Sequence, residues 1–230
     1  MAPLILLPGL SCTPELWDAV RAALPVGINC NALDNPLHDD IDAIAAAILA
    51  TAPPRFALAG FSFGGYVALA IAAQAGERIE RLALVSTGAN ADTPEAAANR
   101  GKFVEIAQGG GYDAIDGKLT KFLLHPDHQA DPAIAAKRSR MSRDYGVGRY
   151  VAHQRACMNR PARASTLASI RVPALVAVGR EDRITPVAQH EEMARRIPAA
   201  ELVVFGQCGH LAPLEAPDEL AAALAKWMTQ

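Results

Sequence analysis

The sequence of 230 residues lacks a long apolar run, a strong charge of either sign and a dense set of cysteines. A membrane-spanning helix needs about 20 consecutive apolar residues, and no stretch of this sequence reaches that length. A formal net charge of −2 gives no general attraction to nucleic acid or to an anionic membrane surface. We therefore expect no nucleic-acid or membrane partner.

The four cysteines are scattered and lack the spacing of metal ligands, so we expect free thiols in a cytoplasmic protein. The two histidines of "HPDH" (125–128) have no further ligands beside them, and no glycine-rich nucleotide-binding pattern follows an expected strand. The sequence thus predicts neither a metal nor an organic cofactor. The apolar start "MAPLILLPGL" has no basic region, so we expect a strand there rather than a signal peptide.

The sequence does contain short apolar runs that alternate with longer helical patterns, and 51% of its residues are hydrophobic. This alternation is typical of an α/β protein with a parallel sheet that is covered on both faces. The expected strands are 3–8, 28–33, 56–61, 81–86, 174–179 and 201–205. The expected helices are 14–24, 40–51, 63–75, 186–197 and 217–228.

The alternation stops between the fourth and fifth expected strands. Residues 88–165 contain no convincing strand, but they contain several helical fragments separated by "GGG", "HPDH" and "YGVG". This stretch is too long for an ordinary connection between parallel strands. We therefore predict an α/β core of residues 1–87 and 166–230, with a helical cap of residues 88–165 inserted into it.

The stretch "GFSFGG" (60–65) lies between an expected strand and an expected helix. In that context G-x-S-x-G indicates a sharp turn that exposes a nucleophilic serine, here Ser62, above the sheet. The backbone N–H of Phe63, at the start of the helix, is placed to stabilise an oxyanion. The alternative interpretation is a structural glycine-rich turn.

A serine hydroxyl needs a base and an acid to become a good nucleophile. His210 follows the last expected strand, whereas the other five histidines lie in loops or on helices and are expected at the surface. Asp182 lies just beyond the strand 174–179, and its neighbour Glu181 is the second choice for the acid. Ser62, Asp182 and His210 would then all lie at the carboxyl edge of the sheet, where α/β proteins bind ligands.

With "LLPGL" (6–10), "GFSFGG" (60–65), "VGREDRITP" (178–186) and "GHLAPLEAP" (209–217), the chain resembles the α/β-hydrolase superfamily along its whole length. The layout of residues 149–186 is most similar to small carboxylesterases and 3-oxoadipate enol-lactonase-like hydrolases. The resemblance implies a catalytic triad of Ser62, Asp182 and His210. It also implies a second oxyanion donor, the N–H of Leu10, in the loop where Pro8 replaces the family's usual histidine.

The same resemblance implies a small-molecule substrate and a monomer or homodimer. Two expectations about the structure also depend on it. The family usually begins with two more strands, so we predict a reduced, all-parallel sheet of six strands. Glu215 matches a glutamate of the family's histidine segment, and we expect it to anchor that loop rather than to take part in the chemistry.

The candidate substrate-binding residues lie mainly in the predicted cap. Arg140 and Arg143, with Arg138 beside them, are candidates for binding a substrate carboxylate, although the exposed face of a cap helix is the alternative interpretation. Phe61, Phe122 and Tyr145 are candidates for lining an acyl pocket, although core packing accounts for most such aromatics.

These features predict a serine hydrolase that cleaves a carboxylic ester or lactone through an acyl-enzyme intermediate. Three alternatives stay open: a carbon–carbon bond hydrolase or lyase with the same triad, a perhydrolase, and a non-catalytic ligand-binding protein with the same fold.

Overall fold

The computed structural model describes residues 2–198 and 200–230. Six parallel strands form one sheet in the order β2-β1-β3-β4-β5-β6. The strands are β1 (Leu4–Leu7), β2 (Cys30–Ala32), β3 (Phe56–Phe61), β4 (Ile79–Val85), β5 (Ala174–Gly179) and β6 (Ala200–Phe205). The prediction of an α/β fold with an all-parallel six-stranded sheet is confirmed.

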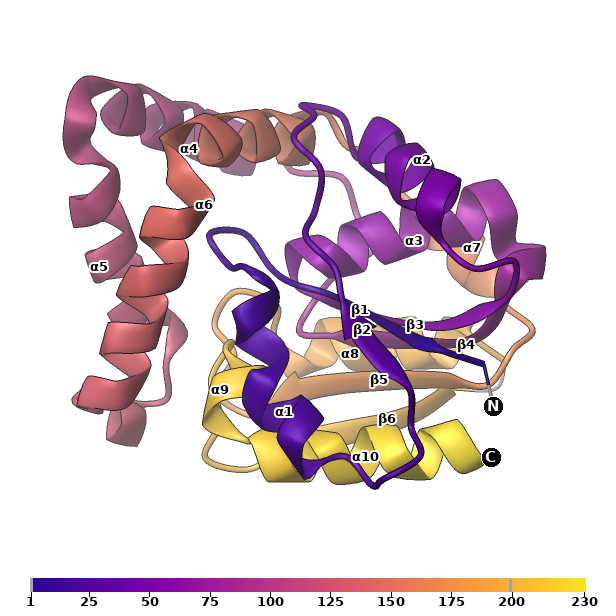
Figure 1. Cartoon of the computed structure of the whole chain (residues 1–230). Helices are drawn as coiled ribbons and strands as arrows, with labels where there is room; N and C mark the ends of the chain where they lie inside the picture. The colour runs from indigo at the N-terminus through magenta and orange to yellow at the C-terminus, as the bar shows by residue number, and fades with distance from the viewer. Residues whose placement is uncertain (1, 199) are drawn as a thin grey trace.

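Helices cover both faces of the sheet, as the strands with two apolar faces require. One apolar cluster joins the sheet to α2 (Ile41–Thr51), α3 (Phe63–Ala75), α7 (Ala164–Ser169) and α8 (Val187–Arg196). The other joins it to α1 (Asp18–Ala23), α9 (Ala212–Glu215) and α10 (Pro217–Thr229). Figure 1 shows α2, α3 and α7 on one side of the sheet and α1 and α10 on the other.

The predicted boundaries of helices and strands agree best with the structure for the buried elements and least well at the edge of the sheet. The expected strand 56–61 and helix 63–75 coincide with β3 and α3. The edge strand expected at 28–33 is shorter, because β2 pairs with β1 only over Cys30–Ala32. The helix expected at 14–24 begins as a 3-10 turn, Pro14–Trp17. The helix α7 was not predicted.

Between β4 and β5 the chain forms three further helices, which we refer to as the cap helices. They are α4 (Pro94–Ile106), α5 (Tyr112–Leu123) and α6 (Pro132–Asn159). The "GGG" and "YGVG" breaks lie where the helical path is interrupted, at Gly110 (φ 89°) and Gly146 (φ 77°). Figure 1 shows α5 and the first part of α6 beyond the end of the sheet. The division of the chain into core and cap stays a prediction.

Within the described residues, no helix combines the length and the apolarity that crossing a membrane requires.

Candidate active site

Ser62 lies at a tight corner between β3 and α3. Its backbone has φ 52° and ψ −113°, a conformation that residues other than glycine rarely adopt. The Ser62 N–H donates to the carbonyl of Val85 on the neighbouring strand at 2.9 Å, and the Ser62 carbonyl accepts from Gly65 N–H at 2.9 Å. These bonds hold the strained serine in place at the start of the helix.

The glycines on either side of Ser62 allow a close approach of backbone segments. A Cβ at Gly60 would lie 2.3 Å from the carbonyl oxygen of Gly64. A Cβ at Gly64 would lie 2.4 Å from the carbonyl oxygen of Leu7. The G-x-S-x-G spacing is therefore required by the packing of the corner against itself and against β1.

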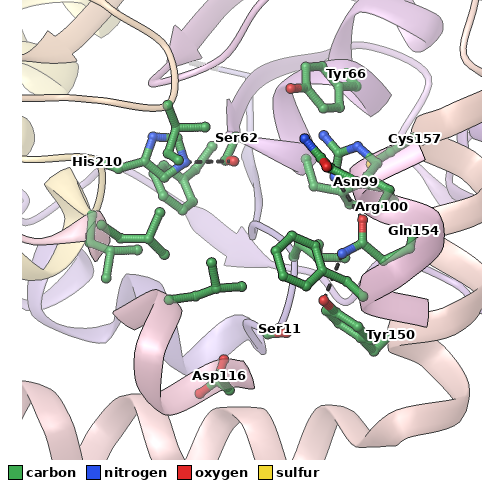
Figure 2. Close-up of a pocket in the computed structure, with 18 of the residues that line it drawn as sticks. Ser11, Ser62, Tyr66, Asn99, Arg100, Asp116, Tyr150, Gln154, Cys157 and His210 are labelled. Atoms are coloured by element: carbon green, nitrogen blue, oxygen red, sulfur yellow. Dashed lines mark hydrogen bonds between the residues drawn. The ribbon is translucent and has the colours of Figure 1, made fainter. Parts of the chain in front are cut away.

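The three residues of the predicted triad lie in hydrogen-bond contact. Ser62 Oγ is 2.9 Å from His210 Nε2, and His210 Nδ1 is 2.8 Å from Asp182 Oδ2. The aspartate accepts from Nδ1–H, which leaves Nε2 as the acceptor for the serine hydroxyl. Figure 2 shows the Ser62–His210 contact at the side of a pocket. The side chains of Asp182 and His210 are buried.

Asp182 is held in its ionised form by its surroundings. Burial alone would raise its pKa, but the attraction and hydrogen bond of His210, with two hydrogen bonds from Thr185, lower it to about 2. Asp182 Oδ1 accepts from the N–H groups of Ile184 and Thr185, each at 2.9 Å, and Oδ2 accepts from the Thr185 hydroxyl at 2.7 Å. Glu181, the second choice for the acid, instead accepts from Cys208 N–H at 3.1 Å.

Glu215 anchors the loop that carries His210, as expected. Its fully buried carboxylate accepts from the N–H groups of Gly209 (3.2 Å) and Leu211 (2.9 Å) on either side of the histidine. It also accepts from His125 N–H at 2.7 Å. These bonds fix the backbone on both sides of His210, so the imidazole is oriented from the chain as well as from Asp182.

The residues 8–12 that follow β1, which we refer to as the β1 loop, lie beside Ser62. Cys12 N–H donates to the Gly9 carbonyl at 3.2 Å, which closes a turn around Leu10. Asn35 Nδ2 donates to the Pro8 carbonyl at 2.9 Å. Phe63 is the first residue of α3, so no carbonyl one turn earlier in the helix accepts its N–H.

A cavity of about 300 Å³ opens beside Ser62 and His210. Most of its lining is apolar and comes from the core and from all three cap helices; it includes Leu10, Phe61, Phe63, Phe103, Leu119, Leu123 and Leu211. The polar lining residues Tyr66, Asn99, Arg100, Tyr150 and Gln154 lie across the pocket from His210 (Figure 2). The site thus offers an apolar binding space with polar groups at its far side.

Of the five candidate substrate-binding residues, the structure brings only Phe61 to this cavity. Phe122 on α5 is 47% exposed, and its ring lies beside the Arg183 guanidinium. Arg140 pairs with Glu15 at the surface, and Arg143, also exposed, donates to Ser139 Oγ.

Tyr145 is buried among the cap helices, where its hydroxyl contacts His153. The alternative interpretations, an exposed helix face and core packing, therefore describe Arg140, Arg143 and Tyr145 better.

The sequence did not single out several polar residues that the structure places at or near the cavity. Arg138 was grouped with the exposed arginines, but it is 2% exposed and lines the cavity. Ser11, Asp116, Arg100 and Gln154 line it as well.

Two of the histidines expected at the surface are fully buried. Burial lowers the pKa of both His153 and His190 to about 4. His190 Nε2 accepts from Thr87 N–H at 3.0 Å, and His153 Nε2 lies 2.8 Å from the Pro36 carbonyl. Both imidazoles are therefore neutral structural groups at pH 7.

The described residues contain no cluster of three or more histidine, cysteine or acidic side chains that could hold a metal ion.

Residues 4–223 match the model of the alpha/beta hydrolase family. A curated relative from Nitrosomonas europaea, a pimeloyl-[acyl-carrier protein] methyl ester esterase, is 27% identical over 246 residues, which cover 95% of this chain and 92% of the relative.

Solved structures of two hydrolases superpose on this chain along its whole length. A thermophilic esterase from Thermogutta terrifontis, with malate bound, superposes with a TM-score of 0.88 at 27% identity and covers 100% of this chain and 90% of its own. The fold is also that of the enol-lactonase from Burkholderia xenovorans LB400, with a TM-score of 0.86, 24% identity, and coverage of 100% of this chain and 92% of the other.

Proposed function

The chain belongs to the alpha/beta hydrolase family, and from that membership we propose that it hydrolyses small carboxylic esters through an acyl-enzyme intermediate on Ser62. The observation that carries the proposal is the unbroken hydrogen-bond chain from Ser62 Oγ through His210 to Asp182, at 2.9 and 2.8 Å. A structural glycine-rich turn would need neither the histidine nor the acid.

In the first half of the proposed reaction, Ser62 Oγ attacks the ester carbonyl while His210 Nε2 takes its proton. The N–H groups of Phe63 and Leu10 bind the oxyanion of the tetrahedral intermediate. Asp182, with a pKa of about 2, stays ionised and stabilises the imidazolium that forms. His210 then returns the proton to the leaving alcohol, and the acyl group stays on Ser62.

In the second half, water takes the place of the alcohol. His210 removes a proton from the water, the hydroxide attacks the acyl carbonyl, and the same two N–H groups bind the second oxyanion. The proton passes from His210 to Ser62 Oγ as the carboxylic acid leaves. The complete cycle returns the triad to its starting state, and no step in it needs a cofactor.

The substrate class that we propose is a small ester with a mainly apolar acyl chain. The cavity of about 300 Å³ lies at the lower end of the range for small-molecule sites, and its lining beside Ser62 is apolar. Methyl esters are the first choice, because the Nitrosomonas europaea relative carries a methyl ester esterase name.

The experiment compares the native chain with Ser62→Ala on methyl and p-nitrophenyl esters of increasing acyl length. We expect saturable hydrolysis by the native chain and a loss of at least about 10⁴-fold in kcat in Ser62→Ala. Ser169→Ala is the matched control, because Ser169 is exposed at the end of α7. It should keep native activity.

The same panel separates the alternatives. Ester turnover that survives in Ser62→Ala would contradict the proposal. Cleavage of a lactone, of a carbon–carbon bond in a vinylogous diketone, or peroxide-dependent oxidation in place of ester turnover would move the assignment to that reaction. Binding of esters without any turnover would identify a non-catalytic ligand-binding protein.

A further inference from the structure

The β1 loop contains a second strained serine. Ser11 has φ 54°, a left-handed conformation that a residue with a side chain adopts at a cost, and it is 4% exposed. Strain of this kind persists only where the surroundings hold the backbone. Ser11 directly follows Leu10, so contacts that hold Ser11 also restrict the backbone of Leu10.

The contacts that hold Ser11 come from the cap helices. Arg138 of α6 donates from Nη1 to the Ser11 carbonyl at 2.9 Å and lies 2.9 Å from Cys12 Sγ. The Tyr112 hydroxyl of α5 lies 3.1 Å from Ser11 Oγ. The other bonds of the loop, from Cys12 N–H to the Gly9 carbonyl and from Asn35 Nδ2 to the Pro8 carbonyl, do not involve Ser11.

Arg138 is itself fixed by an ion pair between two cap helices. Its Nη2 donates to Asp116 Oδ1 of α5 at 2.7 Å, and both side chains are almost fully buried. The Tyr112 hydroxyl also lies 3.2 Å from the Ser142 carbonyl of α6. The same side chains therefore join α5 to α6 and join both helices to the β1 loop. Figure 2 shows Ser11 and Asp116 at the same end of the pocket.

We propose that Arg138 is a positioning residue, which holds the Leu10 amide in place for oxyanion binding through its bond to the Ser11 carbonyl. The inference rests on the proposed function. The cap helices, in addition to covering the substrate, then supply part of the support for the catalytic geometry of the core. Arg138 acts through the β1 loop and takes no part in proton transfer, so its loss should lower kcat and leave the pH profile unchanged.

The test uses four variants of the full chain and a short neutral ester, such as p-nitrophenyl acetate. Arg138→Gln combined with Asp116→Asn removes both charges together, so that no lone charge stays buried. Tyr112→Phe removes only a hydroxyl and keeps the packing. Arg155→Gln is the control, because Arg155 is exposed on the same helix α6.

We expect kcat to fall about 10- to 100-fold in the charge-free double variant and less in Tyr112→Phe, because a displaced oxyanion donor acts mainly on the transition state. KM should stay within about threefold of native, and the apparent pKa of the kcat profile should not move. The control should behave as the native chain. In Arg138→Ala, millimolar guanidinium chloride should restore part of the lost kcat by binding beside Asp116.

A raised KM with native kcat would overturn the inference and make Arg138 a substrate-binding residue. Native kcat in a folded double variant and in Tyr112→Phe would overturn it as well. If the double variant fails to fold, Tyr112→Phe and the guanidinium rescue still decide the question. Failure of the proposed function gives a different result, because activity would then survive in Ser62→Ala.

Discussion

The sheet core and the cap helices are stabilised in different ways. Two large apolar clusters hold the core helices on the sheet, and backbone segments meet at glycines beside Ser62. Among the described residues, the cap helices share a smaller cluster of seven buried residues, three of which, Ala107, Tyr112 and Ile115, lie at the start of α5 and in the turn before it. Polar contacts supplement this small cluster: Arg138 with Asp116 and Tyr145 with His153, which are buried, and Arg100 with Asp92, which is half-buried.

From this difference we infer separate roles for the two regions. Apolar packing and close backbone contacts give the core little freedom, which suits a triad that must keep hydrogen-bond distances. A cap stabilised by polar pairs depends on each pair having its partner, because an unpaired buried charge is costly. In our account the core performs the chemistry, and the cap selects the substrate and supports the β1 loop.

The largest expected effect belongs to the chemistry of the core. Asp182→Asn should lower kcat about 10³- to 10⁴-fold, because an amide can donate to His210 Nδ1 and favour the wrong tautomer. The measurement is steady-state kinetics on a methyl ester, with folding checked by circular dichroism. A loss below tenfold would mean that another group orients His210.

The next effect tests the close packing of the core. Gly64→Ala would place a Cβ 2.4 Å from the Leu7 carbonyl oxygen, so β1 and the β1 loop must shift. We expect a loss of about 3 kcal/mol in the free energy of unfolding, together with a lower kcat. Urea unfolding and steady-state kinetics measure the two losses. Native stability and activity in this variant would contradict the corner as described.

A smaller effect is a loss of stability at low pH. We expect it from one buried histidine in each region, His190 in the core and His153 in the cap. Both have pKa values of about 4, below the usual value near 6.5, so the unfolded chain binds their protons more readily. Their stabilising contribution is complete above about pH 6.5 and is lost as the pH falls toward 4. Each should cost about 2 kcal/mol of unfolding free energy between pH 7 and pH 5.

Urea unfolding at the two pH values checks this expectation. His190→Gln and His153→Gln should each remove one histidine's share of the pH dependence. If neither substitution changes the difference between pH 7 and pH 5, other groups cause the acid sensitivity.

The smallest expected effect is a gain in stability from a substitution in the cap. Gly117 lies within the helix α5, and a Cβ added there would have no atom from outside its own helix within 4 Å. Gly117→Ala should therefore raise the free energy of unfolding by about 0.5–1 kcal/mol, since alanine loses less conformational entropy on folding. Thermal unfolding should show a higher Tm with unchanged kcat. A lower Tm would mean that α5 needs a glycine at this position.

The sequence predicted the core site because its signals are local and the sheet topology is regular. Ser62, Asp182 and His210 each follow a strand, and parallel strands bring their carboxyl ends to one edge. Their hydrogen bonds fit that prediction, while their catalytic roles stay a prediction until tested. The cytoplasmic location and the monomeric or homodimeric state also stay predictions.

The sequence could not show in the same way which cap residues face inward and which face the solvent. Arg138 and Arg140 are two positions apart on α6, so they point to nearly opposite sides of the helix. One is buried against the β1 loop and the other pairs with Glu15 at the surface. The sequence has no clear apolar stripe there to tell which side faces inward.

The measurement that tests the central claim most directly is the intact mass of the chain after treatment with a fluorophosphonate. Such a reagent reacts with an activated serine, so the native chain should gain a single adduct that maps to Ser62. The adduct should be absent from Ser62→Ala and form far more slowly in His210→Ala. A folded native chain that gains no adduct, or gains one at another residue, would contradict the claim that Ser62 is an activated nucleophile.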